Sequence, residues 1–307
     1  MRKGKFLILM LLVSLLVSCG TTTTVPITGR KHTLLVNDQQ ILSLSQQEYN
    51  KFLQSSRKST NSVQSAMVQR VGQKLATAVE SYLRANGMES EIKNFAWEFN
   101  LVQGSDVNAF CMPGGKIAVY EGLLPVTRDE ASLAIVIGHE IAHAVAKHSA
   151  EQMSKKMRQS YGSQIGGTIL GAIGGNTIGS LAQTAASQYF SFQNLKYSRT
   201  HEIEADHIGL IFAAMAGYDP RVAVDFWKRM AAQSSKQGSD MFSSHPSDDK
   251  RIAAIQRSLP EALAYYQQSQ PATPAVKSGT QTTTTTKKPS GAVSASKLYK
   301  KTAAKKK

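Results

Sequence analysis

Residues 138–148 read GHEIAHAVAKH, and this stretch places His139, Glu140 and His143 in an H-E-x-x-H array. Residues four apart lie on one face of an α-helix, so the two imidazoles could reach a single metal ion. Glu140 projects beside the first histidine, where its carboxylate could take a proton from a water molecule that zinc has made acidic. The array therefore predicts a helix with a catalytic zinc site. The alternative is a helix that carries these histidines by chance.

The segment around the array has the signals of a long helix. Thr127 and Glu130 form a capping-box pattern, and the run from there to about residue 158 is compatible with an unbroken helix. His148 lies five residues past His143 and would be displaced around that helix. We therefore expect His148 to be a surface residue near a helix end and not a metal ligand.

The central part of the chain predicts a mostly helical α+β fold with a small antiparallel sheet. Apolar residues at four-residue steps indicate helices, and alternating apolar residues indicate strands. Two of the strands are joined by Pro113-Gly114-Gly115, whose glycines permit positive φ. The expected elements are helices at 62–86, 195–216, 221–235 and 248–268, and strands at 94–102, 108–112 and 116–120.

A catalytic zinc needs a third protein ligand and an open position for water. The segment SRTHEIEADHIG, residues 198–209, places Glu202 and Asp206 on one helical face, while Glu204 points elsewhere. Glu202 could bind zinc, and Asp206 could orient a ligand histidine from behind. A solvated helix with ordinary salt bridges would explain the same charges if the chain held no metal.

The N-terminus has the pattern of an export signal. Residues 1–18 combine a basic start with an apolar run too short to span a bilayer stably, and Cys19 follows directly. The residues before Cys19 resemble a lipobox, so we expect Cys19 to be lipidated. An ordinary signal peptide or an uncleaved anchor is the alternative. Cys111 would then be the only free thiol, and we assign it to packing.

The net charge of +15 is concentrated at the two ends of the 307-residue chain. Residues 1–18 and 271–307 hold 12 of the 36 basic residues and no acids, so residues 19–270 carry only about +3. A basic nucleic-acid-binding face is therefore not expected. The tail over 269–307 should be a disordered basic arm. The glycine-rich segment 162–187 could form a surface loop or hairpin, or it could contact a membrane.

Four ordered motifs give the chain a family resemblance: HEIAH, NAFCMPGGKIAVYEGLL, SRTHEIEAD and SSHPSDDKRI. Over about residues 60–260 it resembles the HtpX/Ste-type zinc metallopeptidases, and particularly their exported bacterial branch of BepA- and LoiP-like lipoproteins. The resemblance implies a zincin-like gluzincin domain with one Zn²⁺ per chain. It implies His139, His143 and Glu202 as ligands, Glu140 as general base and Asp206 as the partner of a ligand histidine.

The same resemblance implies roles for three further parts of the chain. His245 would act at the zinc, either as a fourth ligand that blocks the water or as a donor to the oxyanion of the reaction. Arg251 would be an anchor near the site. Asn108, Ala109 and Phe110 would belong to an edge strand that borders the active site and aligns the substrate backbone.

Together these observations predict a membrane-tethered zinc metalloendopeptidase that cleaves unfolded or misassembled envelope proteins. We expect a lipid anchor and a place on the periplasmic face of a bacterial outer membrane. The expected organisation is a signal at 1–18, a tether and lead-in at 19–55, a peptidase domain at 56–268 and a tail at 269–307. Two alternatives stay open: an envelope chaperone that rarely cleaves, and a structural lipoprotein with an accidental H-E-x-x-H.

Overall fold

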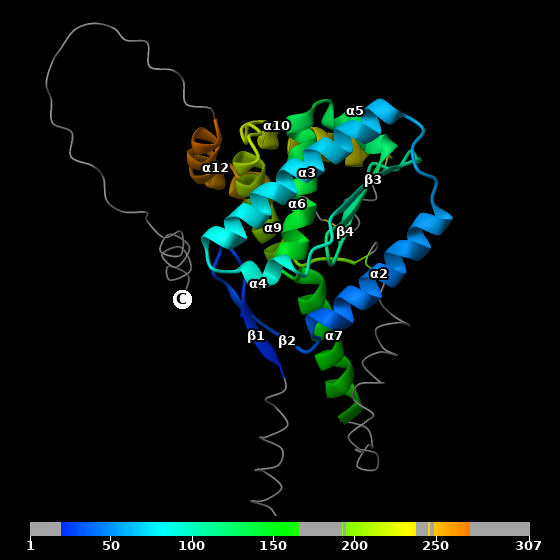
Figure 1. Ribbon diagram of the computed structural model, residues 1–307, viewed down its shortest axis with the longest axis vertical. Helices are drawn as coiled ribbons and strands as arrows, with labels where there is room; N and C mark the ends of the chain where they lie inside the picture. Colours follow the sequence, from blue (N-terminus) through cyan, green and yellow to red (C-terminus); the bar gives the residue numbers. More distant parts are fainter. Residues whose placement is uncertain (1–19, 166–191, 193–194, 238–244, 246–248, 271–307) are drawn as a thin grey trace, which may run out of the picture.

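The computed structural model describes residues 20–165, 192, 195–237, 245 and 249–270 (Figure 1). This part of the chain is mostly helical with two small sheets, which confirms the expected fold class. In chain order the elements are β1 (Thr21–Thr24), β2 (Lys31–Leu34), α2 (Asp38–Ser55), α3 (Ser62–Ala85), α4 (Glu89–Ile92), β3 (Glu98–Val102), β4 (Ala109–Met112), β5 (Lys116–Tyr120), the 3-10 turn η1 (Glu121–Leu123), α5 (Leu124–Thr127), α6 (Glu130–Val145), α7 (His148–Ile165), α9 (Arg199–Met215), α10 (Val222–Gln237) and α12 (Asp249–Ser269).

The three-stranded sheet has the order β3–β5–β4. β4 and β5 form the expected antiparallel pair, and the turn between them uses positive φ at Gly114 (88°) and Gly115 (79°). β3 runs parallel to β5, so the sheet is mixed and not wholly antiparallel. This arises because the chain passes to the far edge through β4 before β5 inserts beside β3. β4 is therefore an edge strand.

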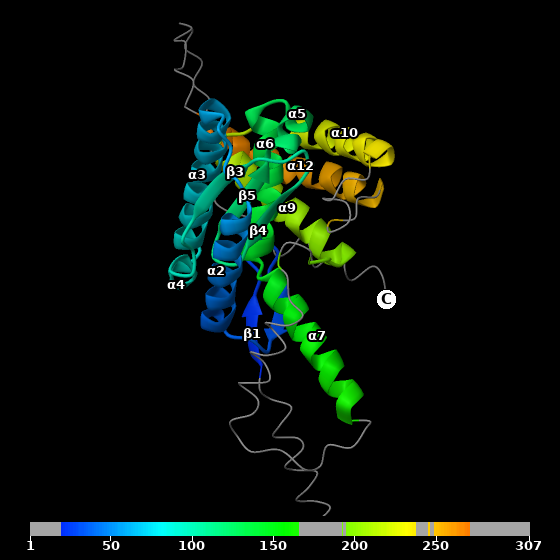
Figure 2. The ribbon, with the colours of Figure 1, turned by 90° about the vertical axis from the view of Figure 1, so that its right-hand side faces the viewer.

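Helix α6 forms the centre of the fold, with α3 on one side and α9 on the other (Figures 1 and 2). Residues 132–143 of α6 are all buried. α6 and α9 approach so closely at Gly138 and Gly209 that a Cβ on Gly209 would lie 2.6 Å from the backbone nitrogen of His139. Only glycine allows this separation, and the crossing brings both helices to the same small region of the core.

The start of α6 differs from the expected capping box. Asp129 is the N-cap, and its carboxylate accepts a hydrogen bond from the backbone N–H of Ser132. Thr127 ends the short helix α5 instead, where its hydroxyl donates to the carbonyl oxygen of Leu124. The Thr127–Glu130 box was therefore a wrong prediction, because the preceding turn already uses the threonine hydroxyl.

The expected unbroken helix to residue 158 is also wrong, because the chain turns between Val145 and His148. Lys147 has a positive φ of 54°. Its ammonium group lies 2.9 Å from carboxylate oxygens of both Asp38 and Glu91. These ion pairs hold the left-handed turn from which α7 begins in a new direction, and they tie α2 and α4 to the end of α6.

The segment expected as tether and lead-in contains regular structure. β1 and β2 form an antiparallel hairpin, and α2 lies against the three-stranded sheet. The Tyr49 hydroxyl of α2 donates to the carbonyl oxygen of Ile117 in β5. The division of the whole chain at residues 18, 55 and 268 stays a prediction.

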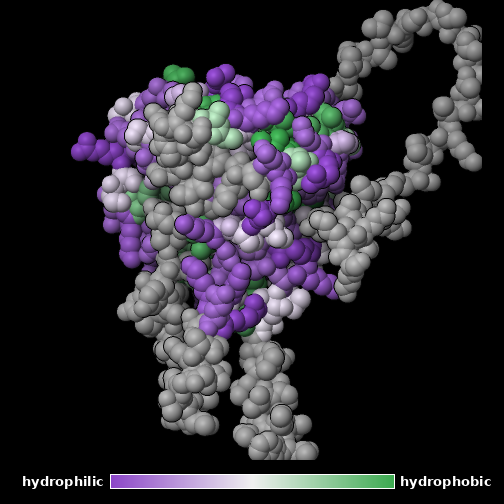
Figure 3. Space-filling view, turned by 180° about the vertical axis from the view of Figure 1, so that it is seen from behind, coloured by the Kyte–Doolittle hydropathy of each residue, from purple (hydrophilic) through white to green (hydrophobic). Residues whose placement is uncertain are grey.

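The described surface is mostly hydrophilic, as Figure 3 shows for one face. Among the described residues, Val63 is the large hydrophobic side chain that is strongly exposed. No helix in the described part combines the length and apolarity needed to cross a membrane. Residues 1–19, with Cys19, the tail from 271 and most of the glycine-rich segment lie outside the described residues.

Candidate metal centre

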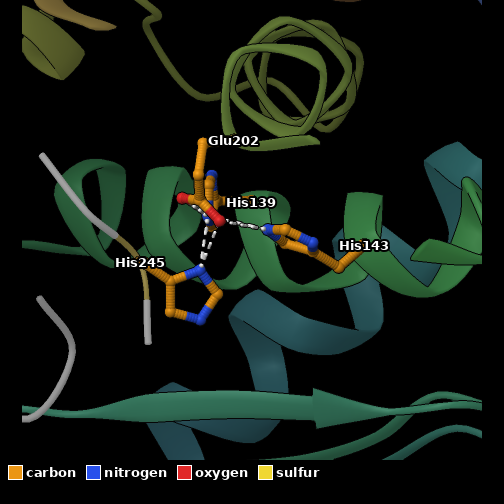
Figure 4. Close-up of side chains that lie close together, drawn as sticks. All are labelled: His139, His143, Glu202 and His245. Atoms are coloured by element: carbon orange, nitrogen blue, oxygen red, sulfur yellow. Dashed lines mark hydrogen bonds and ion pairs between the residues drawn. The ribbon is translucent and has the colours of Figure 1, made fainter. Parts of the chain in front are cut away.

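Four buried side chains from three parts of the chain meet beside the crossing of α6 and α9 (Figure 4). α6 supplies His139 and His143, α9 supplies Glu202, and His245 comes from the segment between α10 and α12. One ligand atom from each lies within 4.8 Å of the other three. In the part of the chain that the structure describes, no other group of three or more histidine, cysteine or acidic side chains is placed to hold a metal ion.

The spacing of these ligand atoms fits a tetrahedral ion. His139 Nε2 lies 3.1 Å from His143 Nε2 and 3.3 Å from His245 Nδ1. The Glu202 carboxylate oxygens lie 3.4 Å from His139 Nε2 and 3.5 Å from His143 Nε2. Ligands bound at about 2.0–2.2 Å from tetrahedral zinc stand about 3.3–3.6 Å apart, and the four separations here, 3.1–3.5 Å, are within about 0.2 Å of that range.

The protonation of His143 and Glu202 also suits a cation, whereas His139 must lose a proton to bind one. Burial opposes the protonation of His139, but hydrogen bonds to Asp206 and Glu202 raise its pKa to about 9. Burial lowers the pKa of His143 well below its usual value, which leaves a neutral imidazole. Burial opposes the ionisation of Glu202, but the neighbouring His245 and His139 hold its pKa well below the ordinary value. Glu202 Oε2 is buried and accepts no hydrogen bond, although Arg251 Nη1 lies 3.0 Å away. A bound cation would complete the surroundings of this oxygen.

Glu140 lies beside the four ligand atoms and is 2% exposed. Its Oε1 is buried without a hydrogen-bond partner, and His245 Nε2 lies 3.6 Å from it. Burial raises the pKa of Glu140, so its carboxyl group is a better proton acceptor than a solvent-exposed glutamate. The position and the raised pKa suit a group that moves a proton next to a metal ion.

Asp206 and Arg251 support the first histidine from behind. Asp206 Oδ1 lies 2.9 Å from His139 Nδ1, on the side of the ring away from the other ligand atoms. Arg251 Nε and Nη2 each donate to the Asp206 carboxylate at 2.8 Å, and the guanidinium stacks 4.3 Å above the Trp227 ring. Arg251 is only 1% exposed. Both residues predicted from the sequence, Asp206 and Arg251, therefore lie at the site, behind His139.

The expectation that His148 is a surface residue is wrong. His148 is fully buried, and its Nδ1 lies 3.0 Å from His143 Nδ1. Its Nε2 lies 3.0 Å from Glu204, which is also buried. The error follows from the turn at Lys147, because a helix continued without a break would have carried His148 away from His143.

Two of these groups have strongly shifted pKa values. Burial lowers the pKa of His148 to about 4. Burial would raise the pKa of Glu204, but hydrogen bonds from His148 and Arg30 lower it to about 2. The sequence offered one signal for this pair: His148 and Glu204 flank the two ligand segments, each within five residues of a candidate ligand.

The edge strand borders the same region, because β4 packs against α6. Ala109 and Phe110 are buried, and Asn108 Oδ1 is buried without a hydrogen-bond partner. Cys111 is a buried free thiol, and burial raises its pKa well above the usual value, which agrees with packing. β4 thus lies at the edge of the three-stranded sheet next to α6, and the backbone N–H of Cys111 in this strand donates a hydrogen bond to the Glu140 carboxylate.

Comparison with characterised proteins finds metallopeptidases. The chain is 36% identical to the mitochondrial metalloendopeptidase OMA1 of Arabidopsis thaliana over 61% of this chain and 37% of that protein. It is 32% identical to human mitochondrial metalloendopeptidase OMA1 over 78% of this chain and 46% of that protein. It is 28% identical to the beta-barrel assembly-enhancing protease of Yersinia pestis over 51% of this chain and 33% of that protein. The chain therefore spans half or less of the length of these relatives.

These relatives correct the expected location on a bacterial outer membrane. Similar proteins from a plant, a yeast and a mammal are mitochondrial by name, and they match the chain at 32–38% identity. The bacterial relatives match a shorter part of the chain at 28% identity. The prediction of a periplasmic outer-membrane lipoprotein is therefore contradicted.

The part of the chain that holds the four ligand atoms also matches a known peptidase family. The sequence pattern of Peptidase family M48 matches residues 63–259, which include α6, α9 and His245. Metallopeptidases of this family use zinc, and the ligand atoms here have a spacing that suits that ion. An accidental H-E-x-x-H is thereby excluded, and the chain belongs to peptidase family M48.

Proposed function

We propose that this chain is a zinc metalloendopeptidase in which His139, His143 and Glu202 hold one Zn²⁺. The observation that carries the proposal is the convergence of these ligand atoms at close to tetrahedral spacing, beside a buried glutamate and the edge strand β4. A zinc ion bound there would polarise the peptide carbonyl and make a water molecule acidic enough to attack it. The rest of the chemistry belongs to side chains of this chain.

Glu140 is the proposed general base and general acid. Its unpartnered Oε1 can take the proton of the attacking water, and the neutral carboxyl group can later give that proton to the leaving amine nitrogen. Asp206, held by Arg251, accepts a hydrogen bond from His139 Nδ1 and so keeps Nε2 of this ring as the ligand atom. Arg251 also faces Glu202 and thereby orients two of the three ligands.

His245 closes the site in this conformation. Its Nδ1 lies 3.1 Å from Glu202 Oε1 and 3.3 Å from His139 Nε2, so it stands at the fourth corner of the ligand set. Its Nε2 faces Glu140, where the attacking water would have to lie. These distances favour the blocking role over that of an oxyanion donor. We infer that His245 moves away before substrate enters.

The substrate class is proposed on the sheet edge and on the relatives. An extended peptide can add to β4 as a further strand, with Asn108, Ala109 and Phe110 next to its backbone. Such binding needs an extended chain and therefore selects unfolded or misassembled proteins. The narrower class of membrane-assembled clients has support from the name of the beta-barrel assembly-enhancing proteases.

The direct test of the proposed chemistry is Glu140→Gln, assayed with casein as an unfolded substrate. We expect hydrolysis to fall by about 10² to 10⁴-fold, because a positioned proton-transfer group contributes about that much. Zinc content should stay at one ion per chain, since the substitution leaves the proposed ligands in place. Glu48→Gln, at a half-exposed position of α2 where Glu48 pairs with Lys51, is the matched control and should cleave at the wild-type rate. Equal activity of Glu140→Gln and the wild type would refute the proposal.

A chaperone-like binding role is the second candidate, and the position of His245 is the observation that favours it. A ligand set closed by a fourth side chain would hold a client on β4 without hydrolysis. If Glu140→Gln keeps the full biological activity of the wild type in cells while casein cleavage is lost, the binding role is favoured. If both activities are lost together, the peptidase role is favoured.

A further inference from the structure

The second ligand histidine has an outer partner that the H-E-x-x-H pattern does not contain. His143 uses Nε2 for the ligand set, and its other ring nitrogen lies 3.0 Å from His148 Nδ1. His148 Nε2 in turn lies 3.0 Å from Glu204 Oε2. All three side chains are buried, so water does not compete for these hydrogen bonds. The line from Glu204 to His143 is the counterpart of the Asp206 contact to His139.

The positions of the protons follow from the ends of this line. Glu204 also accepts hydrogen bonds from Arg30 Nε at 2.8 Å and from the Thr28 hydroxyl at 2.6 Å, so it acts only as an acceptor. His148 must therefore donate from Nε2, and in a neutral ring its Nδ1 is then an acceptor. His143 consequently donates from Nδ1. This leaves the lone pair of His143 Nε2 directed at the metal site, as a zinc ligand requires.

The outer end of the line lies in the N-terminal hairpin. Thr28 and Arg30 belong to the turn between β1 and β2, which precedes the part of the chain matched by the family pattern. Arg30 also forms a two-point contact with Glu151 of α7 at 2.9 and 2.8 Å. The hairpin is thus tied to α9 and α7, the helices that carry Glu204 and His148.

We propose that His148 is a positioning residue that keeps His143 in the metal-binding tautomer, with Glu204 and the Thr28–Arg30 turn holding His148 in place. The proposal rests on the proposed zinc site. It assigns to the N-terminal hairpin a part in metal binding, although the hairpin contributes no ligand atom. It also explains why a histidine and a glutamate are buried together behind His143.

The test compares zinc affinity, measured by competition with a chromophoric chelator, in the wild type and in variants of the full chain. His148→Leu removes the acceptor for His143 Nδ1–H and should weaken zinc binding by about 10- to 100-fold. His148→Asn keeps an acceptor oxygen near the position of Nδ1 and should recover most of that loss. Arg30→Met should weaken binding in the same direction by a smaller factor, because it loosens Glu204.

His201→Leu is the matched control. His201 is buried and its ring stacks on His148 at 4.4 Å, while its Nε2 faces Glu151 at 3.4 Å and not the ring of His143. His201→Leu therefore makes the same change in the same cluster, but one ring further from His143. The zinc affinity of this variant should stay within about twofold of the wild type. Equal losses in His148→Leu and His201→Leu would mean that only packing matters and would overturn the proposal.

A second readout follows the tautomer itself. In zinc-free protein labelled with ¹⁵N-histidine, NMR should find His143 protonated at Nδ1 in the wild type and in His148→Asn, and not in His148→Leu. An unchanged tautomer in His148→Leu would refute the proposal even if affinity fell. A wild-type protein that binds no zinc would refute the proposed function instead, whereas wild-type affinity in a folded His148→Leu would refute only the positioning role.

Discussion

The crossing of α6 and α9 makes Gly209→Ala a sharp test of how the ligand set is assembled. The added methyl group would lie 2.6 Å from the backbone nitrogen of His139 and 2.8 Å from the carbonyl oxygen of Gly138. Both neighbours are backbone atoms, so no side chain can rotate away. Glu202 lies two helical turns before Gly209 on the same face of α9, and any separation of the helices carries it with them.

The size of the effect follows from these distances. Non-bonded carbon atoms prefer separations of about 3.5–4.0 Å, so the helices must part by roughly 1 Å near the crossing. Metal sites tolerate deviations of about 0.2 Å in ligand distance, and a misplacement of about 1 Å costs an enzyme about 100-fold in rate. Overpacking should also lower the free energy of unfolding by about 1–3 kcal/mol.

The assay combines casein hydrolysis, zinc affinity and unfolding by urea for each variant. Gly72→Ala is the matched control: its methyl group would collide with the Phe99 ring between α3 and β3, away from the ligand set. Both variants should lose stability, and only Gly209→Ala should lose zinc affinity and activity. Full zinc affinity in a folded Gly209→Ala would refute the view that this glycine contact sets the ligand distances.

Three further predictions concern the same centre. His245→Ala should raise casein hydrolysis, because it opens the fourth corner of the ligand set; a loss of about 10² to 10³-fold would instead identify an oxyanion donor. Free zinc at 100 times its Kd should raise the free energy of unfolding by about 2.7 kcal/mol in the wild type and not in Glu202→Ala, and an equal rise in both would exclude Glu202 as a ligand. Burial lowers the pKa of His148 to about 4 from 6.5, so only the unfolded chain gains this proton between those pH values. Zinc-free protein should therefore lose about 3 kcal/mol of stability as the pH falls from about 6.5 to 4, and equal pH slopes for wild type and His148→Asn would contradict this.

Much of the fold was predictable because its signals are local. The apolar spacing of 62–86 identified α3, and the turn at Pro113–Gly115 identified the β4–β5 pair. The helix expected to end at residue 216 corresponds to α9, and Gly217 follows it with a positive φ of 86°. The parallel pairing of β3 with β5 had no local signal, since it depends on which strand the chain lays beside another.

The site residues likewise fall into two groups: those with a local sequence signal, and those placed by contacts between distant segments. His139 and His143 share one helical face, and a spacing of four residues makes that visible in the sequence. The burial of His148 depends on the turn at Lys147, which is held by Asp38 and Glu91 from distant parts of the chain. Ion pairs between remote segments leave no periodic pattern, and the outer partner of His143 was therefore missed.

The most direct test of the zinc site is anomalous diffraction at the zinc edge from crystals of the zinc-loaded protein. The account predicts one strong peak per chain, about 2.0–2.2 Å from His139 Nε2, His143 Nε2 and a carboxylate oxygen of Glu202. A protein without stoichiometric zinc, or a peak that leaves Glu202 outside coordinating distance, would contradict it.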